Sequence, residues 1–190
     1  MRKTILIITL MAGLATTGAA QDTKNKDHSI YMEIGGASNF VGINYDARFK
    51  KDSPWGYRTG LNWCYSKSSS IFGDSQSLKG YTVPIEVNYL LGKHKSHFEL
   101  GAGVNLGIYN EHYIGYEIIG KTDNGGYEMI ANKLSHNTFG YFFYGNIGYR
   151  HVSAKGFQFR TGICPSFNFN DSHGVSRGWF YPYVSFGMAF

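Results

Sequence analysis

Serine, histidine and aspartate lie close together at two places in the chain where they could supply nucleophilic catalysis. His151 and Ser153 are one residue apart, and Asp171, Ser172 and His173 are consecutive. A serine nucleophile needs a histidine base that a third, acidic group orients. The first pair has no evident acid, and three consecutive residues rarely converge on one point. We therefore expect no catalytic residue at either place, and we expect Asp171 and Ser172 to shape a turn.

Metal and thiol chemistry have little support in the spacing. His112, His136 and His173 could share a metal ion only if long loops brought them together, because they lack the paired spacing of metal-binding motifs. Cys64 and Cys164 are too few for a disulfide scaffold, and we expect them to be free, buried thiols. No metal site and no cofactor is expected.

The composition excludes further classes. Of the 190 residues 16% are charged and 17% are aromatic, and the formal net charge is +5. Nucleic-acid-binding proteins gather lysine and arginine on one face, so this mild excess predicts no nucleic-acid partner. Ordinary soluble domains carry about 25% charged residues, so a chain with 16% would have difficulty covering a soluble surface. Outside the N-terminus no apolar run approaches the roughly 18 residues that a membrane helix needs.

Apolar and polar residues instead alternate with the period of two that is typical of β-strands. The last segment, Trp179–Phe190, is the clearest, because Phe180, Val184, Phe186 and Phe190 share one of its faces. Each predicted segment is close to the roughly 9–11 residues with which a tilted strand crosses a bilayer. The eight segments span residues 29–36, 40–49, 56–66, 80–91, 97–109, 139–151, 157–168 and 179–190.

The predicted connections alternate in length. Those at residues 50–55, 92–96 and 152–156 are short, whereas those at 67–79, 110–138 and 169–178 are long, and only 37–39 breaks the pattern. The sequence therefore predicts an all-β protein, an eight-stranded antiparallel up-and-down transmembrane β-barrel with short inner turns and longer outer loops. Within the longest loop, residues 112–121 and 127–134 flank a strong turn signal, so we expect an external hairpin there.

The strand register collects four acids and four bases on the polar face. They are Glu33, Asp46, Arg48, Arg58, Glu86, Glu99, Arg150 and Arg160. A soluble lipocalin-like calyx with an apolar ligand would turn this face to water, whereas a membrane barrel would turn it to the lumen. The numerical balance of the charges and the aromatic residues near the strand ends favour the membrane barrel. A basic residue facing mid-bilayer lipid costs about 2–4 kcal/mol.

Two interpretations of these lumen charges remain open. An eight-stranded barrel is only just wide enough for side chains to fill it. Four acids facing four bases would form a structural network that closes the lumen, which is the interpretation we favour. The alternative is a porin-like leak for small solutes or ions.

The N-terminus has the pattern of a secretory signal. Arg2 and Lys3 precede an apolar stretch, and Gly18-Ala19-Ala20 resembles a cleavage site. The expected organisation is a cleavable signal peptide at 1–20, a flexible lead-in at 21–28 and a transmembrane barrel at 29–190.

The chain resembles the small eight-stranded outer-membrane barrels of Gram-negative bacteria, and in style the outer-membrane-protein β-barrel domain common in Bacteroidetes. The resemblance is carried by the cleavage-site pattern, by Tyr31–Gly36, Val41–Tyr45 and Tyr57–Leu61, and by the final aromatic strand. It implies location in the outer membrane, contact with its lipid, and recognition of Phe186 and Phe190 by the barrel-insertion machinery. It implies no agreed activity.

A second resemblance carries the enzymatic alternative. Lipid A deacylases are eight-stranded barrels with a His-x-Ser arrangement, which His151 and Ser153 resemble. Here the pair falls at an inner turn, away from the outer leaflet, and Ala154 stands where those enzymes have asparagine. An outer-leaflet lipid-modifying enzyme is therefore kept only as an alternative.

The long hairpin is more apolar than a solvated loop requires. We expect a contact surface for an unknown protein or glycan there, formed by Tyr113, Ile114, Tyr116, Ile118 and Tyr127. The alternative is that these side chains pack on the rim of their own barrel. The favoured function is that of a non-enzymatic structural, anchoring or surface-recognition protein.

Overall fold

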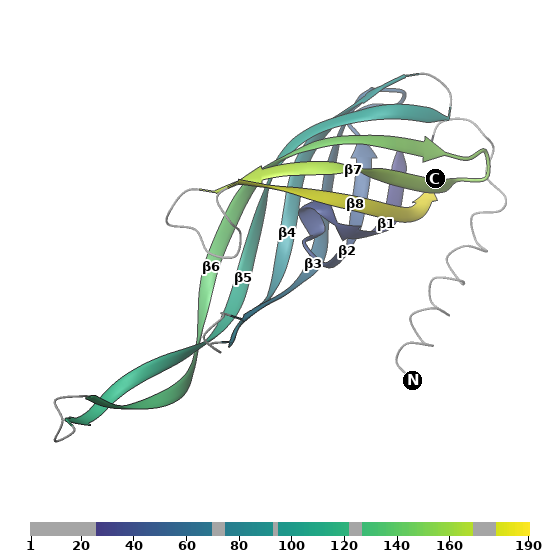
Figure 1. The fold of residues 1–190 in the computed structure, drawn as a ribbon. Coiled ribbons are helices and arrows are strands. Elements are labelled where there is room, and N and C mark those ends of the chain that lie inside the picture. The colour runs from purple at the N-terminus through teal and green to yellow at the C-terminus, as the bar shows by residue number, and fades with distance from the viewer. Residues whose placement is uncertain (1–25, 70–74, 93–94, 122–126, 169–177) are drawn as a thin grey trace, which may run out of the picture.

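The chain folds into one closed β-barrel (Figure 1). The computed structural model describes residues 26–69, 75–92, 95–121, 127–168 and 178–190. Within these residues, eight antiparallel strands pair in chain order and the first pairs with the last. The strands are β1 (His28–Gly35), β2 (Val41–Arg48), β3 (Trp55–Ser69), β4 (Ser75–Leu91), β5 (Ser96–Lys121), β6 (Tyr127–Val152), β7 (Phe157–Phe167) and β8 (Gly178–Ala189).

The predicted fold and its two faces are confirmed. Along β4 the side chains of Thr82, Glu86 and Asn88 are buried, whereas that of Ile85 is 50% exposed. The apolar side chains therefore cover the exterior and the polar ones fill the interior. A soluble calyx would need the opposite arrangement, so it is not favoured. Helices of the length and apolarity needed to cross a membrane are absent from the described residues.

The strands on the long-loop side run further than predicted. The predicted loop 67–79 is wrong over most of its length, because β3 continues to Ser69 and β4 begins at Ser75. The segment is rich in serine, but the ladder between β3 and β4 continues out to the pair Ser69 and Ser75. The predicted hairpin is confirmed: β5 and β6 each have 26 residues and pair well beyond the barrel (Figure 1).

The connection at 37–39 is not an outer loop. Gly36–Ser38 form a short 3-10 helix, η1, whose Ala37 and Ser38 are fully buried inside the barrel. Gly35 has φ +76°, and a Cβ there would lie 2.3 Å from the carbonyl oxygen of Pro182, so this turn requires glycine. Ala37 packs in a cluster with Phe142, Tyr144, Cys164 and Tyr183. The segment thus fills the lumen near the long-loop rim.

Prolines within the strands interrupt the pairing at two places. Pairing of β3 with β4 is broken opposite Pro84, and pairing of β6 with β7 is broken opposite Pro165. Neither break shifts the register, and a third proline, Pro182, pairs in register with Ile163. Proline removes a hydrogen-bond donor, but the flanking pairs hold the register.

Candidate functional site

The interior of the barrel is the first candidate site. Seven of the eight predicted charged side chains are at most 4% exposed, and Arg48 lies at the short-turn end with 7% of its side chain exposed. They come from every strand except β8. The seven are Glu33, Asp46, Arg58, Glu86, Glu99, Arg150 and Arg160.

One half of the interior network is centred on Arg58 and Glu33. The guanidinium of Arg58 lies 3.3 Å from the carboxylate of Glu86 and 2.5 Å from that of Glu33. Glu33 in turn lies 3.6 Å from Arg160. Arg58 and Glu86 are cross-strand partners on the neighbouring strands β3 and β4. Glu33 on β1 and Arg160 on β7 join them from strands further round the barrel.

The other half continues from Arg160 without a break. Glu99 lies 2.7 Å from both Arg160 and Arg150. Arg150 reaches Asp46 at 2.8 Å, and Asp46 reaches Arg48 at 2.5 Å. The eight residues therefore form one chain in which acids and bases alternate, and their formal charges sum to zero.

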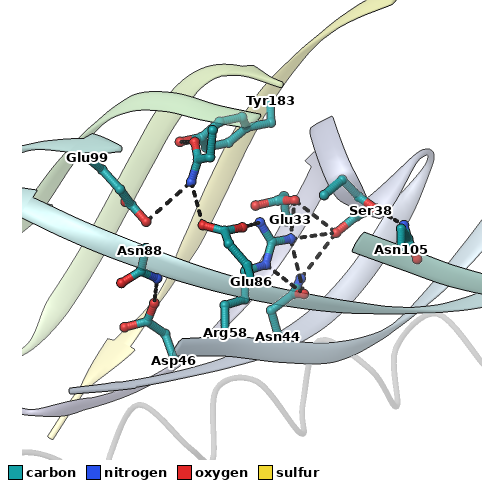
Figure 2. A network of polar contacts seen from close by, with 12 residues as sticks. Glu33, Ser38, Asn44, Asp46, Arg58, Glu86, Asn88, Glu99, Asn105 and Tyr183 are labelled. Carbon is teal, nitrogen blue, oxygen red and sulfur yellow. Dashed lines mark hydrogen bonds and ion pairs between the residues drawn. The ribbon is translucent and has the colours of Figure 1, made fainter. Parts of the chain in front are cut away.

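Amide and hydroxyl groups extend this network (Figure 2). Asn146 donates to Glu86 at 3.0 Å and to Glu99 at 3.4 Å, which links the two halves a second time. Its own carbonyl oxygen accepts a hydrogen bond from the hydroxyl of Tyr183 on β8 at 2.9 Å. Asn44 and Asn88 accept hydrogen bonds from Arg58 and Arg48. Period-two alternation could have identified these asparagines, but not their partners.

The helix η1 is bound to the same network. The hydroxyl of Ser38 donates to Glu33 at 3.0 Å and accepts from Asn44 at 3.2 Å. The amides of Asn62 and Asn105, on β3 and β5, donate to the carbonyl oxygen of Ala37. The sequence does not reveal this arrangement, because a three-residue connection carries no signal that it turns inward.

Burial of this many charged side chains requires that each charge has an oppositely charged partner. Removing one ion from water costs several kcal/mol even after relaxation, and a partner with good geometry must offset that cost. Every one of the eight charges has an oppositely charged partner within 3.6 Å. Chemically, the arrangement can brace the strands and block the lumen.

An open cavity of about 520 Å³ lies at the short-turn end, below Asp46 and Arg150. It includes Ser153, whose hydroxyl has no hydrogen-bond partner in the described residues. The Nδ1 atom of His151 instead lies 3.1 Å from the hydroxyl of Ser96. The histidine is therefore not positioned to activate Ser153.

The other candidate residues for catalysis and metal binding do not assemble either. Residues 171–173 lie outside the described residues. His112 and His136 belong to opposite faces of the hairpin, because His112 pairs with Ser135. No group of three metal-ligating residues occurs in the part of the chain that the structure describes. Cys64 and Cys164 are buried and free, as predicted.

The external hairpin is the second candidate site. It extends away from the barrel (Figure 1), and the exposed fractions of Tyr116, Ile118 and Tyr127 are 56%, 60% and 62%. Tyr113 and Ile114 lie closer to the barrel and are less exposed. The alternative in which this hairpin packs on the barrel rim is wrong for these outer residues, since their side chains face solvent.

The proposed insertion residues lie on the exterior near the C-terminus. Phe186 is 41% exposed and Phe190 is 46% exposed. Phe186 contacts Phe157 and Phe159 on the neighbouring strand β7. Both phenylalanines therefore belong to the apolar outer surface.

Comparison with known proteins shows a likeness of fold without a likeness of sequence. No family model matches the chain, and no curated protein matches it. Among solved structures, the N-terminal β-barrel domain of OprF from Pseudomonas aeruginosa matches with a TM-score of 0.51 and 10% identity, covering 87% of this chain and 98% of that domain. Ail, the attachment invasion locus protein of Yersinia pestis, matches with a TM-score of 0.46, 9% identity and coverages of 86% and 95%. CarO of Acinetobacter baumannii matches with a TM-score of 0.45, 10% identity and coverages of 90% and 100%. With the closed topology and the apolar exterior, the likeness to the OprF domain identifies the fold as that of an eight-stranded outer-membrane β-barrel.

Proposed function

We propose that this protein is a non-enzymatic barrel of the outer membrane of a Gram-negative bacterium, and that it anchors its β5–β6 hairpin at the cell surface as a contact element. The lumen is closed to solutes. The observation that carries this proposal is the unbroken chain of alternating charges across the interior.

Closure of the lumen follows from the size and neutrality of that chain. A solute that entered would have to separate paired ions that are already out of water. The helix η1 adds a second barrier on the long-loop side, because Ala37 and Ser38 fill the space beside Glu33. A leak for small ions is therefore the weaker alternative.

The surface role rests on the hairpin. An isolated two-stranded hairpin is marginal in water, and this one carries exposed Tyr116, Ile118 and Tyr127. A rigid barrel that presents such residues is suited to bind a protein or glycan. Tyr113 and Ile114 continue this surface toward the barrel.

Three finer assignments belong to the same proposal. Motifs such as Tyr31–Gly36 and Val41–Tyr45 support a barrel domain of the Bacteroidetes type. The signal at residues 1–20 and the lead-in up to residue 28 would deliver the barrel to the membrane, although residues 1–25 lie outside the described part. The exposed Phe186 and Phe190 would be read by the barrel-insertion machinery.

Conductance measurements test the closed lumen. The refolded protein is inserted into planar lipid bilayers beside a general porin as the positive control. We expect no current steps above those of the protein-free membrane. Reproducible steps whose number follows the amount of folded barrel would contradict the closed lumen.

Cysteine labelling tests the orientation. Gly120→Cys lies near the hairpin tip and Lys155→Cys lies in the β6–β7 turn. A membrane-impermeant maleimide added to intact cells should label the first, and should label the second only after the outer membrane is permeabilised. The buried native cysteines add no background. Labelling of Lys155→Cys alone would reverse the proposed orientation.

Crosslinking tests the contact role. A photoreactive amino acid is placed at Tyr116 or at Ile118, and the protein is crosslinked on living cells. The same amino acid at Lys155 is the matched control. We expect protein or glycan adducts from the two hairpin positions only. Equal adducts from all three positions, or none, would remove the recognition role and leave the anchoring role.

A further inference from the structure

The exterior of β4, β5 and β6 changes from apolar to polar at one level. Tyr81, Ile108 and Phe139 are cross-strand neighbours and are each at least 60% exposed, so they mark the long-loop edge of the apolar belt. The next row outward is Lys79, Asn110 and Asn137, and the row after that is Ser77, His112 and Ser135.

A groove of about 330 Å³ lies at these rows. Its polar lining consists of Ser77, Lys79, His112, Lys133 and Ser135. Tyr113, Ile114 and Leu134 form its apolar part, at the notch where β4 stops pairing with β5. We call it the basic groove.

The acids of this region lie on the other face. Glu111 and Glu117 alternate with His112 along β5, and Glu128 alternates with Lys133 along β6. Glu111 contacts His136 at 3.5 Å, and Glu117 accepts a hydrogen bond from Asn132 at 3.2 Å, both on that opposite face. Of the described acids in the hairpin, none therefore neutralises the lysines of the basic groove.

The inner end of the groove, at Lys79, lies at the depth of lipid phosphates. One row is two residues, or about 7 Å along a strand, so Lys79 stands about 7 Å beyond the apolar belt. The headgroup zone of each leaflet is about 5–8 Å thick. The ammonium group of Lys79 therefore lies at headgroup level. Lys133 pairs with Ile114 two rows further out, and its side chain lines the outer part of the same groove.

We propose that the basic groove binds the phosphorylated headgroup of an outer-leaflet lipid, with Lys79 and Lys133 contacting the phosphate oxygens. The hydroxyls of Ser77 and Ser135 and the ring of His112 supply hydrogen bonds to the same headgroup, while the acyl chains lie on Tyr81, Ile108 and Phe139. This deepens the proposed function and rests on the membrane orientation stated there. The bound lipid would support the base of the exposed hairpin.

Native mass spectrometry of the refolded barrel in zwitterionic detergent tests the site. The probes are bisphosphorylated lipid A and the same lipid without its phosphates. We expect the barrel to retain only the phosphorylated lipid. The double variant Lys79→Gln/Lys133→Gln should bind this lipid with an affinity lowered by roughly tenfold or more, since each lysine near an anionic lipid surface contributes appreciably to binding. The matched control is Lys50→Gln/Lys155→Gln, at the short-turn end, which should bind like the native protein.

Several results would overturn the proposal. One is that both lipids are retained equally, and another is that both double variants lose affinity for the phosphorylated lipid equally. A third is that millimolar inorganic phosphate displaces the phosphorylated lipid, which would indicate a site for soluble anions. Folding of Lys79→Gln/Lys133→Gln is checked by the heat-dependent gel migration of a folded barrel. If this variant does not fold, Ser135→Glu provides the second test. It adds a negative charge to the groove and should also abolish retention of the phosphorylated lipid. Conductance and the labelling of Gly120→Cys do not depend on lipid phosphate, so failure here leaves the proposed function standing.

Discussion

The carboxylate of Glu99 on β5 is held by the guanidinium of Arg160 on β7, inside the barrel and past the intervening strand β6. Its Oε2 atom accepts from Nε at 3.0 Å and its Oε1 atom accepts from Nη2 at 2.7 Å. Parallel hydrogen bonds of this kind fix orientation as well as adding energy. Because β6 lies between these two strands in the barrel wall, the pair braces the cylinder against collapse and blocks its interior.

Glu99→Gln should destabilise the barrel strongly. The substitution keeps the shape of the side chain but leaves Arg150 and Arg160 short of one negative charge. Breaking one side of a buried ion pair costs about 3–5 kcal/mol. Urea-induced unfolding in lipid vesicles measures the change. Glu111→Gln, on the solvent-exposed hairpin, is the control and should cost less than about 1 kcal/mol. Equal unfolding midpoints for the two variants would refute the bracing role.

Gly148→Ala should disturb the packing of Tyr183. A Cβ at Gly148 would lie 2.1 Å from the hydroxyl oxygen of Tyr183 and 2.8 Å from the carbonyl oxygen of Thr161. Overpacking of this kind costs about 1–3 kcal/mol, again read from urea unfolding. Gly120→Ala is the control, since the nearest atom there is 3.5 Å away. If Gly148→Ala unfolded at the same urea concentration as the native protein, the hydrogen bond from Tyr183 to Asn146 would not be needed for the stability of the barrel.

Asn105→Ala should loosen η1. The substitution removes one of the two amide donors to the buried carbonyl oxygen of Ala37 and leaves Asn62 at 3.4 Å. A single intramolecular hydrogen bond contributes about 0.5–1.5 kcal/mol. Stability is compared with that of Asn110→Ala on the same strand, whose amide donates to exposed Asn137. We expect the first variant to be clearly less stable. The reverse order would show that η1 contributes little to the fold.

Ile85→Arg and Tyr81→Arg should differ in cost according to depth. Both side chains point outward from β4, but Ile85 lies within the apolar belt and Tyr81 lies at its edge. An arginine at mid-bilayer costs about 2–4 kcal/mol and near the interface about 0–1 kcal/mol. Folding titrations in vesicles give both values. Equal costs would argue against a bilayer centred on Ile85.

Thiol reactivity should report on the closed interior. Cys64 and Cys164 are at most 4% exposed and both are free. We expect neither to react with a maleimide in the folded barrel, and both to react in urea. Rapid labelling of the folded protein would mean that the lumen admits small molecules. Gly120→Cys, tested in the same way, provides the positive control for an exposed thiol.

Much of the charge network could be anticipated from the sequence, but not its connections. The alternation along β4 and β5 assigns Glu86 and Glu99 to one face, because a one-residue slip would move such charges into lipid. Alternation does not reveal that Glu99 meets Arg160 on β7 or that Asn146 links Glu86 to Glu99. Those contacts depend on which strands oppose one another after closure, and closure is a property of the whole sheet.

The sequence by itself determined the strand count, the face of each strand and the external hairpin. These are local quantities, set by a period of two, a turn signal and the energetic cost of placing a charge in lipid. The tertiary structure alone decided the inward turn of η1, the extension of β3 and β4 through a serine-rich segment, and the basic groove. Each of these depends on neighbouring strands. The lumen accepts Ala37 of η1, the hydrogen-bonded ladder of β3 and β4 continues beside β5, and three adjacent strands place Lys79 and Lys133 on one side of the sheet. Residues far apart in the chain acquire such relations only when the barrel closes.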